Sequence, residues 1–173
     1  MNRKQVILAM SAILMLAGRS WSATGAASIE GTKEDSDISG QLRFDDTPKG
    51  LHVTGVVENV PSGNHGFHIH EFGDCGDEGK NAGSHFNPDG TPHGMVMTDG
   101  LMKAHAGDMG NLVADEKGTA NIDLVIPGVT LTGGKYAVAG RAVIVHEKKD
   151  DFGQPTGNAG GRIACAPIVL TGK

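Results

Sequence analysis

Apolar and polar residues alternate along several short segments of the chain, which is the period of a β-strand with one buried face. In residues 38–44 the apolar positions, Leu42 and Phe44 among them, fall on one face and polar residues on the other. A similar run covers 51–57, and the two runs are separated by the turn-forming segment 45–50. The pattern therefore predicts a β-hairpin.

A third alternating run, residues 66–71, differs from the first two because histidines occupy the face opposite its apolar residues. Period two sends Phe67 and Ile69 to one side and His68 and His70 to the other. One face of this strand is expected to pack in a core and the other to bind a ligand.

The rest of the chain reads as short strands and two long loops. Residues 23–36 have no clear period, so we expect a flexible lead-in or a weak edge strand there. Further strands are predicted at 112–114, 122–126, 136–146 and 163–170. Glycine-rich segments at 72–111 and 147–161 are expected to be functional loops. No convincing helical period occurs, and short strands joined by Gly/Pro turns are typical of an all-β sandwich or barrel.

Residues 1–22 have the pattern of a secretory signal peptide, with a basic start, an apolar stretch at 6–17 and small residues after it. That stretch is too short for a membrane span, which needs about 20 residues. Arg19 stands where a lipoprotein signal requires a cysteine, so no membrane anchor is expected. We predict one soluble domain, residues 23–173, that is exported to the periplasm or secreted.

Charge excludes a general nucleic-acid or anionic-membrane surface. The whole chain has a formal net charge of −5, and glycine is its unusual component at 27 of 173 residues. Removing 1–22 takes away three basic residues and no acid, which leaves 12 basic against 20 acidic residues and a formal charge of −8. Any anionic substrate must therefore be attracted locally.

The chain has two cysteines, Cys75 and Cys165. In an exported protein an even count is most simply explained by one disulfide, the alternative being two free buried thiols. A bridge across 90 positions would stabilise the fold by about 4–5 kcal/mol through loop entropy.

Histidines supply the candidate chemistry, because five of the eight lie in or beside the first long loop. Two histidines two apart on a strand, His68 and His70, project from one face as ligands of one metal must. Three more, with a carboxylate three residues after the last, suit Zn²⁺: His85, His93, His105 and Asp108. His146, at the end of an alternating run, could add an imidazole to the first site.

An imidazole-only site suits Cu(II), Zn or Ni, and it differs from an electron-transfer copper centre because it has no thiolate or axial methionine. A single histidine is more often a surface or hydrogen-bonded residue, and that interpretation is kept for His52 and His65. Clustering favours metal binding for the other six.

Two long motifs carry a family resemblance: GFHIHEFGD at 66–74 and GNAGGRIAC at 157–165. Between them HFNP at 85–88, HG at 93–94, HAGD at 105–108 and HEK at 146–148 stand in the same order and spacing. Together they resemble the copper/zinc superoxide dismutases, of the exported bacterial type. The similarity runs from about residue 37 to 170.

The resemblance implies an eight-stranded Greek-key β-barrel or sandwich with two long functional loops, and one copper and one zinc per subunit. It assigns copper to His68, His70, His85 and His146. It assigns zinc to His85, His93, His105 and Asp108, so that His85 bridges the two metals. Asp150 matches a carboxylate that links His68 to His93, although from the residues alone it reads as part of a solvated charged loop. Cys75 and Cys165 match the family disulfide.

The implied reaction converts two superoxide anions and two protons to O₂ and hydrogen peroxide by Cu(II)/Cu(I) cycling, protecting the cell envelope. Arg162 matches the family's anion-guiding arginine, and His85 would also donate a proton. The loop 151–157 is shorter than in better-known members; Lys148 and Lys149 are candidates to replace its charges or are a solvated turn. A homodimer is one expectation for the assembly. The alternative function is a noncatalytic periplasmic copper/zinc buffer.

Overall fold

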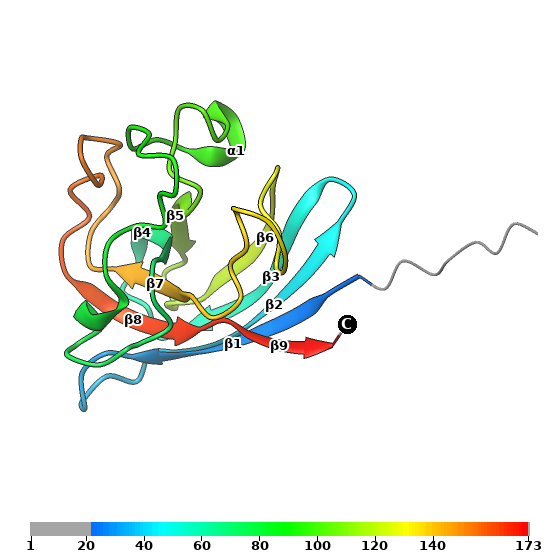
Figure 1. Cartoon of the computed structure of the whole chain (residues 1–173). Coiled ribbons are helices and arrows are strands. Elements are labelled where there is room, and N and C mark those ends of the chain that lie inside the picture. Colours follow the sequence, from blue (N-terminus) through cyan, green and yellow to red (C-terminus); the bar gives the residue numbers. More distant parts are fainter. Residues whose placement is uncertain (1–21, 173) are drawn as a thin grey trace, which may run out of the picture.

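The computed structural model describes residues 22–172, so the predicted signal peptide, 1–22, lies outside the described residues except for Ser22. The described chain is almost entirely antiparallel β-structure and loops (Figure 1). Its strands are β1 (Thr24–Gly31), β2 (Ser39–Thr47), β3 (Gly50–Glu58), β4 (Gly63–His70), β5 (Asp108–Ala114), β6 (Ala120–Ile126), β7 (Ala142–His146), β8 (Arg162–Pro167) and β9 (Val169–Gly172).

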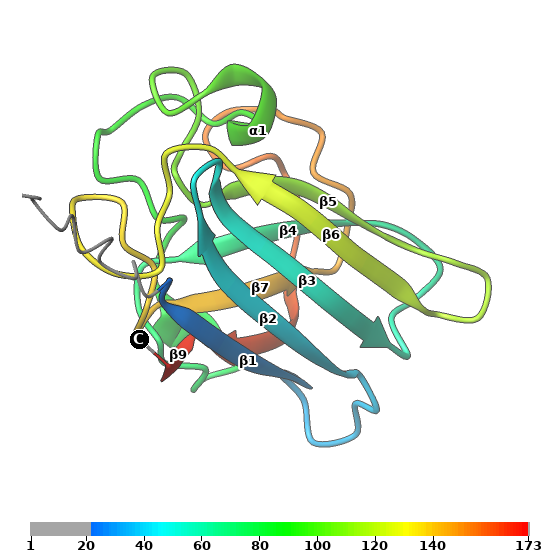
Figure 2. The same cartoon turned by 90° about the vertical axis from the view of Figure 1, so that its right-hand side faces the viewer.

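Eight strands form one antiparallel sheet in the order β5-β4-β7-β8-β1-β2-β3-β6, and β9 pairs with β1 beyond the end of β8. The outer strands of this row, β5 and β6, lie side by side, so the sheet curls into a nearly closed barrel (Figure 2). The predicted all-β, eight-stranded barrel is confirmed. Because β5 and β6 lie against each other, the two edges of the sheet are partly covered, which protects them from aggregation.

The core follows from the alternation of side chains. Leu42 and Phe44 of β2 are buried inside the barrel, whereas Arg43 between them is exposed. On β4 the inward residues are Phe67 and Ile69, each fully buried. Burying an apolar side chain of this size contributes about 1.5–3 kcal/mol, so the pattern fixes which face of each strand turns inward.

The outward face of β4 is buried as well, because two long loops cover it. The first loop, residues 71–107, carries the short helices η1 (Lys80–Ala82) and α1 (Val96–Asp99). The second, residues 147–161, joins β7 to β8. Neither described helix is long and apolar enough to cross a membrane.

A disulfide joins Cys75 of the first loop to Cys165 of β8, which confirms the predicted bridge across 90 positions. The guanidinium of Arg162, on the same strand, donates hydrogen bonds to the carbonyl oxygens of Gly79 and Gly83. The start of the first loop is therefore attached to the barrel at several points.

Three sequence predictions were wrong in detail. Residues 24–31 form the strand β1, paired with β2, β8 and β9, where a lead-in or weak edge strand was expected. The first loop ends at residue 107, because β5 begins at Asp108, inside the segment 72–111 that was expected to be loop. Of the predicted strand 136–146, only residues 142–146 form a regular strand. The predicted strand 163–170 is divided at Ile168 into β8 and β9.

Candidate metal centre

Four buried histidines meet on the outward face of β4 and form what we call the first cluster: His68, His70, His85 and His146. One ring nitrogen from each lies within 4.8 Å of those of the others. β4 contributes two of them and β7, its neighbour in the sheet, contributes His146. His85 reaches the cluster because its backbone pairs with that of His70.

The ring nitrogens of this cluster face one another with lone pairs. Burial lowers the pKa of His70 to about 2 and that of His146 to about 3, so both rings are neutral at pH 7. His70 donates its Nδ1 proton to the carbonyl of Gly83 at 3.0 Å, and His146 Nδ1 lies 3.4 Å from the carbonyl of Gly160. Each Nε2 then carries a lone pair, and the two Nε2 atoms are only 3.3 Å apart. A cation between them would relieve this repulsion.

The second cluster consists of three histidines around one buried carboxylate: His85, His93, His105 and Asp108. The Nδ1 atoms of His85 and His105 lie 2.8 and 3.0 Å from Asp108 Oδ1. His93 Nδ1 lies 2.8 Å from the other oxygen, Oδ2. Asp108 begins β5, and its side chain is completely buried. Three imidazoles and one carboxylate are a common donor set for Zn²⁺.

Hydrogen bonds determine the charge of this carboxylate. Burial alone would raise the pKa of Asp108, but hydrogen bonds from His105, His85 and the N–H of Gly94, together with the nearby ring of His93, outweigh burial and hold the pKa far below its usual range. For His85, burial is the largest effect and lowers the pKa to about 4. The second cluster therefore contains a carboxylate anion beside a neutral imidazole that belongs to both clusters.

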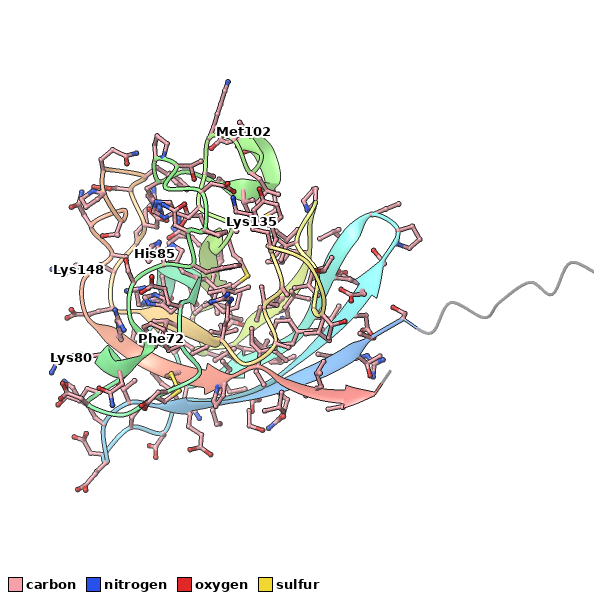
Figure 3. All side chains as sticks on the ribbon, in the orientation of Figure 1. Phe72, Lys80, His85, Met102, Lys135 and Lys148 are labelled. Carbon is pink, nitrogen blue, oxygen red and sulfur yellow. A yellow bond between two sulfur atoms is a disulfide. The ribbon has the colours of Figure 1, made fainter. Side chains whose placement is uncertain are left out.

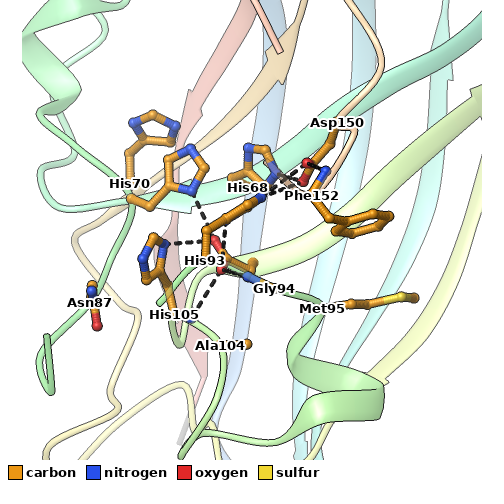
Figure 4. Close-up of polar contacts among 12 residues, drawn as sticks. His68, His70, Asn87, His93, Gly94, Met95, Ala104, His105, Asp150 and Phe152 are labelled. Carbon is orange, nitrogen blue, oxygen red and sulfur yellow. Dashed lines mark hydrogen bonds and ion pairs between the residues drawn. The ribbon is translucent and has the colours of Figure 1, made fainter. Parts of the chain in front are cut away.

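Asp150 connects the two clusters, because its carboxylate contacts one histidine of each (Figure 4). Its Oδ2 lies 2.9 Å from His68 Nε2 and 3.0 Å from His93 Nε2. Burial would raise the pKa of Asp150, but hydrogen bonds from these two rings outweigh it, so the carboxyl is ionised. An ionised carboxylate only accepts hydrogen bonds, so both rings donate their Nε2 protons to it. This is the arrangement by which a carboxylate fixes the tautomer of a metal-binding histidine.

The opposite nitrogens of those two rings are left without a partner. Within residues 22–172, His68 Nδ1 and His93 Nδ1 are the buried side-chain nitrogen or oxygen atoms that have no hydrogen bond. His93 Nδ1 lies 2.8 Å from Asp108 Oδ2 without a hydrogen bond between them. A buried polar atom without a partner costs about 1–3 kcal/mol, so these atoms fit metal ligands better than structural groups.

His93 differs from the other histidines in its protonation. Burial lowers its pKa, but the hydrogen bond that its Nε2 donates to Asp150 and the negative charges of Asp108 and Asp150 outweigh burial and raise the pKa to about 9. Without metal, this ring is an imidazolium between two carboxylates. A metal ion in the second cluster would take the place of that positive charge.

A cavity of about 360 Å³ opens onto the first cluster. His70, His85 and His146 lie in its wall together with Arg162, whose guanidinium is held by the carbonyls of Gly79 and Gly83. Figure 3 shows Lys148 and Lys80 at the edge of the molecule on this side. The cavity thus joins the imidazole cluster to a fixed positive charge, as an anion-binding site requires.

All the predicted site residues are brought together, and the two histidines set aside in the sequence lie elsewhere. His52 pairs with Asp123 on the barrel surface at 2.7 Å. His65 is buried, with its ring nitrogens 2.9 Å from the carbonyl of His146 and 2.8 Å from that of Pro61. It supports the backbone of a cluster residue, which agrees with a structural role.

Sequence reasoning missed Asn111, which positions Asp150. The side-chain amide of Asn111 donates to the carbonyl of Asp150 at 3.0 Å and accepts from its N–H at 2.8 Å. Asn111 lies inside β5 with no motif around it. An amide that pairs with the backbone 39 residues away leaves no local pattern from which to predict it.

Comparisons with known proteins agree with this geometry. The family model for copper/zinc superoxide dismutase matches residues 38–168. Superoxide dismutase [Cu-Zn] A of Xenopus laevis is 41% identical over 140 residues, which cover 76% of this chain and 89% of the relative. The extracellular superoxide dismutase [Cu-Zn] of Brugia pahangi is 36% identical over 148 residues, which cover 80% of this chain and 72% of the relative.

The fold is similar to a solved structure as well. A crystal structure described as that of the clock protein EA4 superimposes with a TM-score of 0.76 and 38% identity. The similarity covers 87% of this chain and 96% of the other. Family match, relatives and geometry lead to one conclusion: the chain belongs to the copper/zinc superoxide dismutase family, whose members are oxidoreductases that bind one copper and one zinc per subunit.

Proposed function

We propose that the first cluster, His68, His70, His85 and His146, binds copper and that the second, His85, His93, His105 and Asp108, binds zinc. The observation that carries this proposal is the pair of buried donor sets that share His85. Lone pairs that face each other in the first set suit Cu(II), and three imidazoles with a carboxylate suit Zn²⁺. Cys75–Cys165 would hold the first loop over both sites.

Bound copper supplies the one-electron oxidation and reduction that turn two superoxide anions and two protons into O₂ and hydrogen peroxide. The side chains of the protein orient the substrate and move protons. His85 Nδ1 is directed at Asp108, so Nε2 is the atom that takes up a proton and releases it to an anion in the cavity. Asp150 fixes the rings of His68 and His93, which keeps both donor sets in place.

Arg162 binds the anion in the cavity and guides it there. Its guanidinium is fixed by two carbonyls, so its positive charge stays in the cavity wall. The mature chain carries a formal charge of −8, which repels anions at long range. At a screening length of about 8 Å in physiological salt, a nearby arginine outweighs distant acids. Lys148, whose side chain lies against Gly160 of the cavity wall, adds to this local field.

In the cell we propose an exported enzyme of the bacterial type, periplasmic or secreted, that protects the cell envelope from superoxide. The pattern of residues 1–22 supports export, and so does the disulfide, which is stable in oxidising compartments. One relative is named an extracellular enzyme. Both named relatives come from eukaryotes, so the bacterial type rests on the sequence motifs alone.

A homodimer is the proposed assembly. Phe72 is 58% exposed, and Val169 and Leu170 of β9 are exposed too. They lie on neighbouring segments, because Gly73 packs against Gly140, whose N–H donates to the carbonyl of Ile168. Exposed apolar side chains on neighbouring segments favour an interface over open solvent.

The activity is tested on mature protein loaded with copper and zinc, assayed for superoxide disproportionation per bound copper. We expect a fast, cyanide-sensitive rate that His146→Ala loses, because the variant lacks one ligand of the first cluster. His52→Ala, at an exposed histidine outside the clusters, is the control and should keep the full rate. If the protein binds copper tightly but superoxide disproportionates no faster than in solution without it, the result would support the metal-buffer alternative. The names of the relatives do not support that alternative.

Removing the positive charge of Arg162 tests the guiding role. Arg162→Ala should lower kcat/KM about 10-fold and flatten its dependence on ionic strength, because the attraction that salt screens is gone. Arg162→Lys keeps the charge and should retain most of the salt dependence. Stopped-flow rates between about 10 and 500 mM salt measure both effects. Unchanged kinetics in the alanine variant would eliminate the role.

The form of the protein in its own host is tested on material purified from separated cell compartments. Intact-mass measurement should find a chain that begins near residue 23, outside the cytoplasm.

The assembly is tested on the same material. Light scattering should give twice the mass of one chain, and Phe72→Glu should halve the measured mass, because a buried unpaired charge disrupts an apolar interface. Full-length cytoplasmic protein would contradict export, and a wild-type monomer at high concentration would contradict the dimer.

A further inference from the structure

Gln154, in the short loop 151–157, makes a two-way contact with the backbone of His93. The N–H of His93 donates to Gln154 Oε1 at 3.0 Å, and Gln154 Nε2 donates to the carbonyl of His93 at 2.9 Å. A planar amide that pairs with both the donor and the acceptor of one residue fixes the position and the direction of that residue. The two residues are 61 positions apart in the chain.

The backbone of His93 depends on this contact. His93 lies in the irregular part of the first loop, outside any strand, and is only 4% exposed. Within residues 22–172, its N–H and carbonyl find their hydrogen bonds on Gln154 and on no other group. Buried backbone groups need partners, so the carboxamide of Gln154 supplies what a neighbouring strand would otherwise supply.

Other residues of the same loop surround the ring of His93. Phe152 stacks on it, with ring centroids 6.3 Å apart and planes inclined by 22° (Figure 4). Gly157, at φ +78°, leaves the space that Asp150 and His93 fill: a Cβ there would lie 1.9 Å from Asp150 Oδ1 and 2.7 Å from His93 Nε2. The loop therefore contacts His93 at the backbone through Gln154 and at the ring through the other residues.

We propose that Gln154 is a positioning residue for the zinc site, which holds His93 so that its Nδ1 is directed at the second cluster. This inference rests on the metal centre proposed above. Gln154 itself is exposed, and both hydrogen bonds of its carboxamide go to His93. Replacing Gln154 would leave the buried N–H and carbonyl of His93 without these partners, so the effect of its loss falls first on His93 and on the zinc site.

The test compares zinc release from the metal-loaded wild type, Gln154→Ala and Gln154→Met, timed with a coloured chelator. Both variants should release zinc about 10-fold faster than the wild type, the cost typical of losing a group that orients a metal ligand. Methionine keeps the length of the side chain without either hydrogen bond. Cobalt(II) bound in place of zinc should show altered visible absorption bands in both variants, because its geometry follows the direction of His93.

Gln41→Ala is the matched control, because Gln41 is an exposed glutamine on β2 whose side chain, within residues 22–172, bonds to the hydroxyl of Ser28 alone. It should leave zinc release and the cobalt spectrum unchanged. Zinc release from Gln154→Ala within twofold of the wild type would overturn the inference, and so would equal acceleration by Gln41→Ala. If Gln154→Met released zinc as slowly as the wild type while Gln154→Ala released it fast, the side chain would act by covering the site and not by its hydrogen bonds, which also overturns the inference. A wild type that retains no zinc would overturn the metal centre itself.

Discussion

Buried lone pairs that face each other are the constraint on which the rest of this structure depends. Burial keeps His70 and His146 neutral, and their Nδ1–H groups point at backbone carbonyls, so two Nε2 atoms that carry lone pairs are held 3.3 Å apart. Such an arrangement costs free energy in the metal-free protein unless a cation is bound. We infer that stability and function are linked here, because the metal ions that the proposed reaction and the structure of the site require would also remove this cost.

The barrel and the loops divide the work of maintaining that arrangement. β4 and β7 fix three histidines through sheet register, since a slip by one residue would send them into the core. The remaining ligands lie on loops, which need separate attachments. Cys75–Cys165 attaches one end of the first loop, and Asp150 of the second loop accepts hydrogen bonds from the rings of His68 and His93. Arg162 belongs to both tasks, because the carbonyls that hold its guanidinium are in the first loop.

Much of this organisation could be predicted from sequence, and the failures have physical causes. Strands with large apolar residues, such as Leu42 and Phe44, were predicted correctly because burial determines their alternation. β1 was predicted only as a lead-in or a weak edge strand, because two of the three buried residues in it are Gly25 and Ala27, which give little hydropathy signal. The clustered histidines indicated metal sites, and the family motifs assigned each one. Asn111 and Gln154 could not be predicted, because a side-chain amide that pairs with distant backbone depends on the folded path of two loops.

The central claim is that two different metals share the ring of His85, and diffraction from crystals of the loaded protein tests it most directly. Data collected on either side of the copper and zinc absorption edges locate each element separately. We expect one copper peak among His68, His70 and His146 and one zinc peak among His93, His105 and Asp108, with the His85 ring between them. A single metal peak, or either element bound away from these residues, would contradict it.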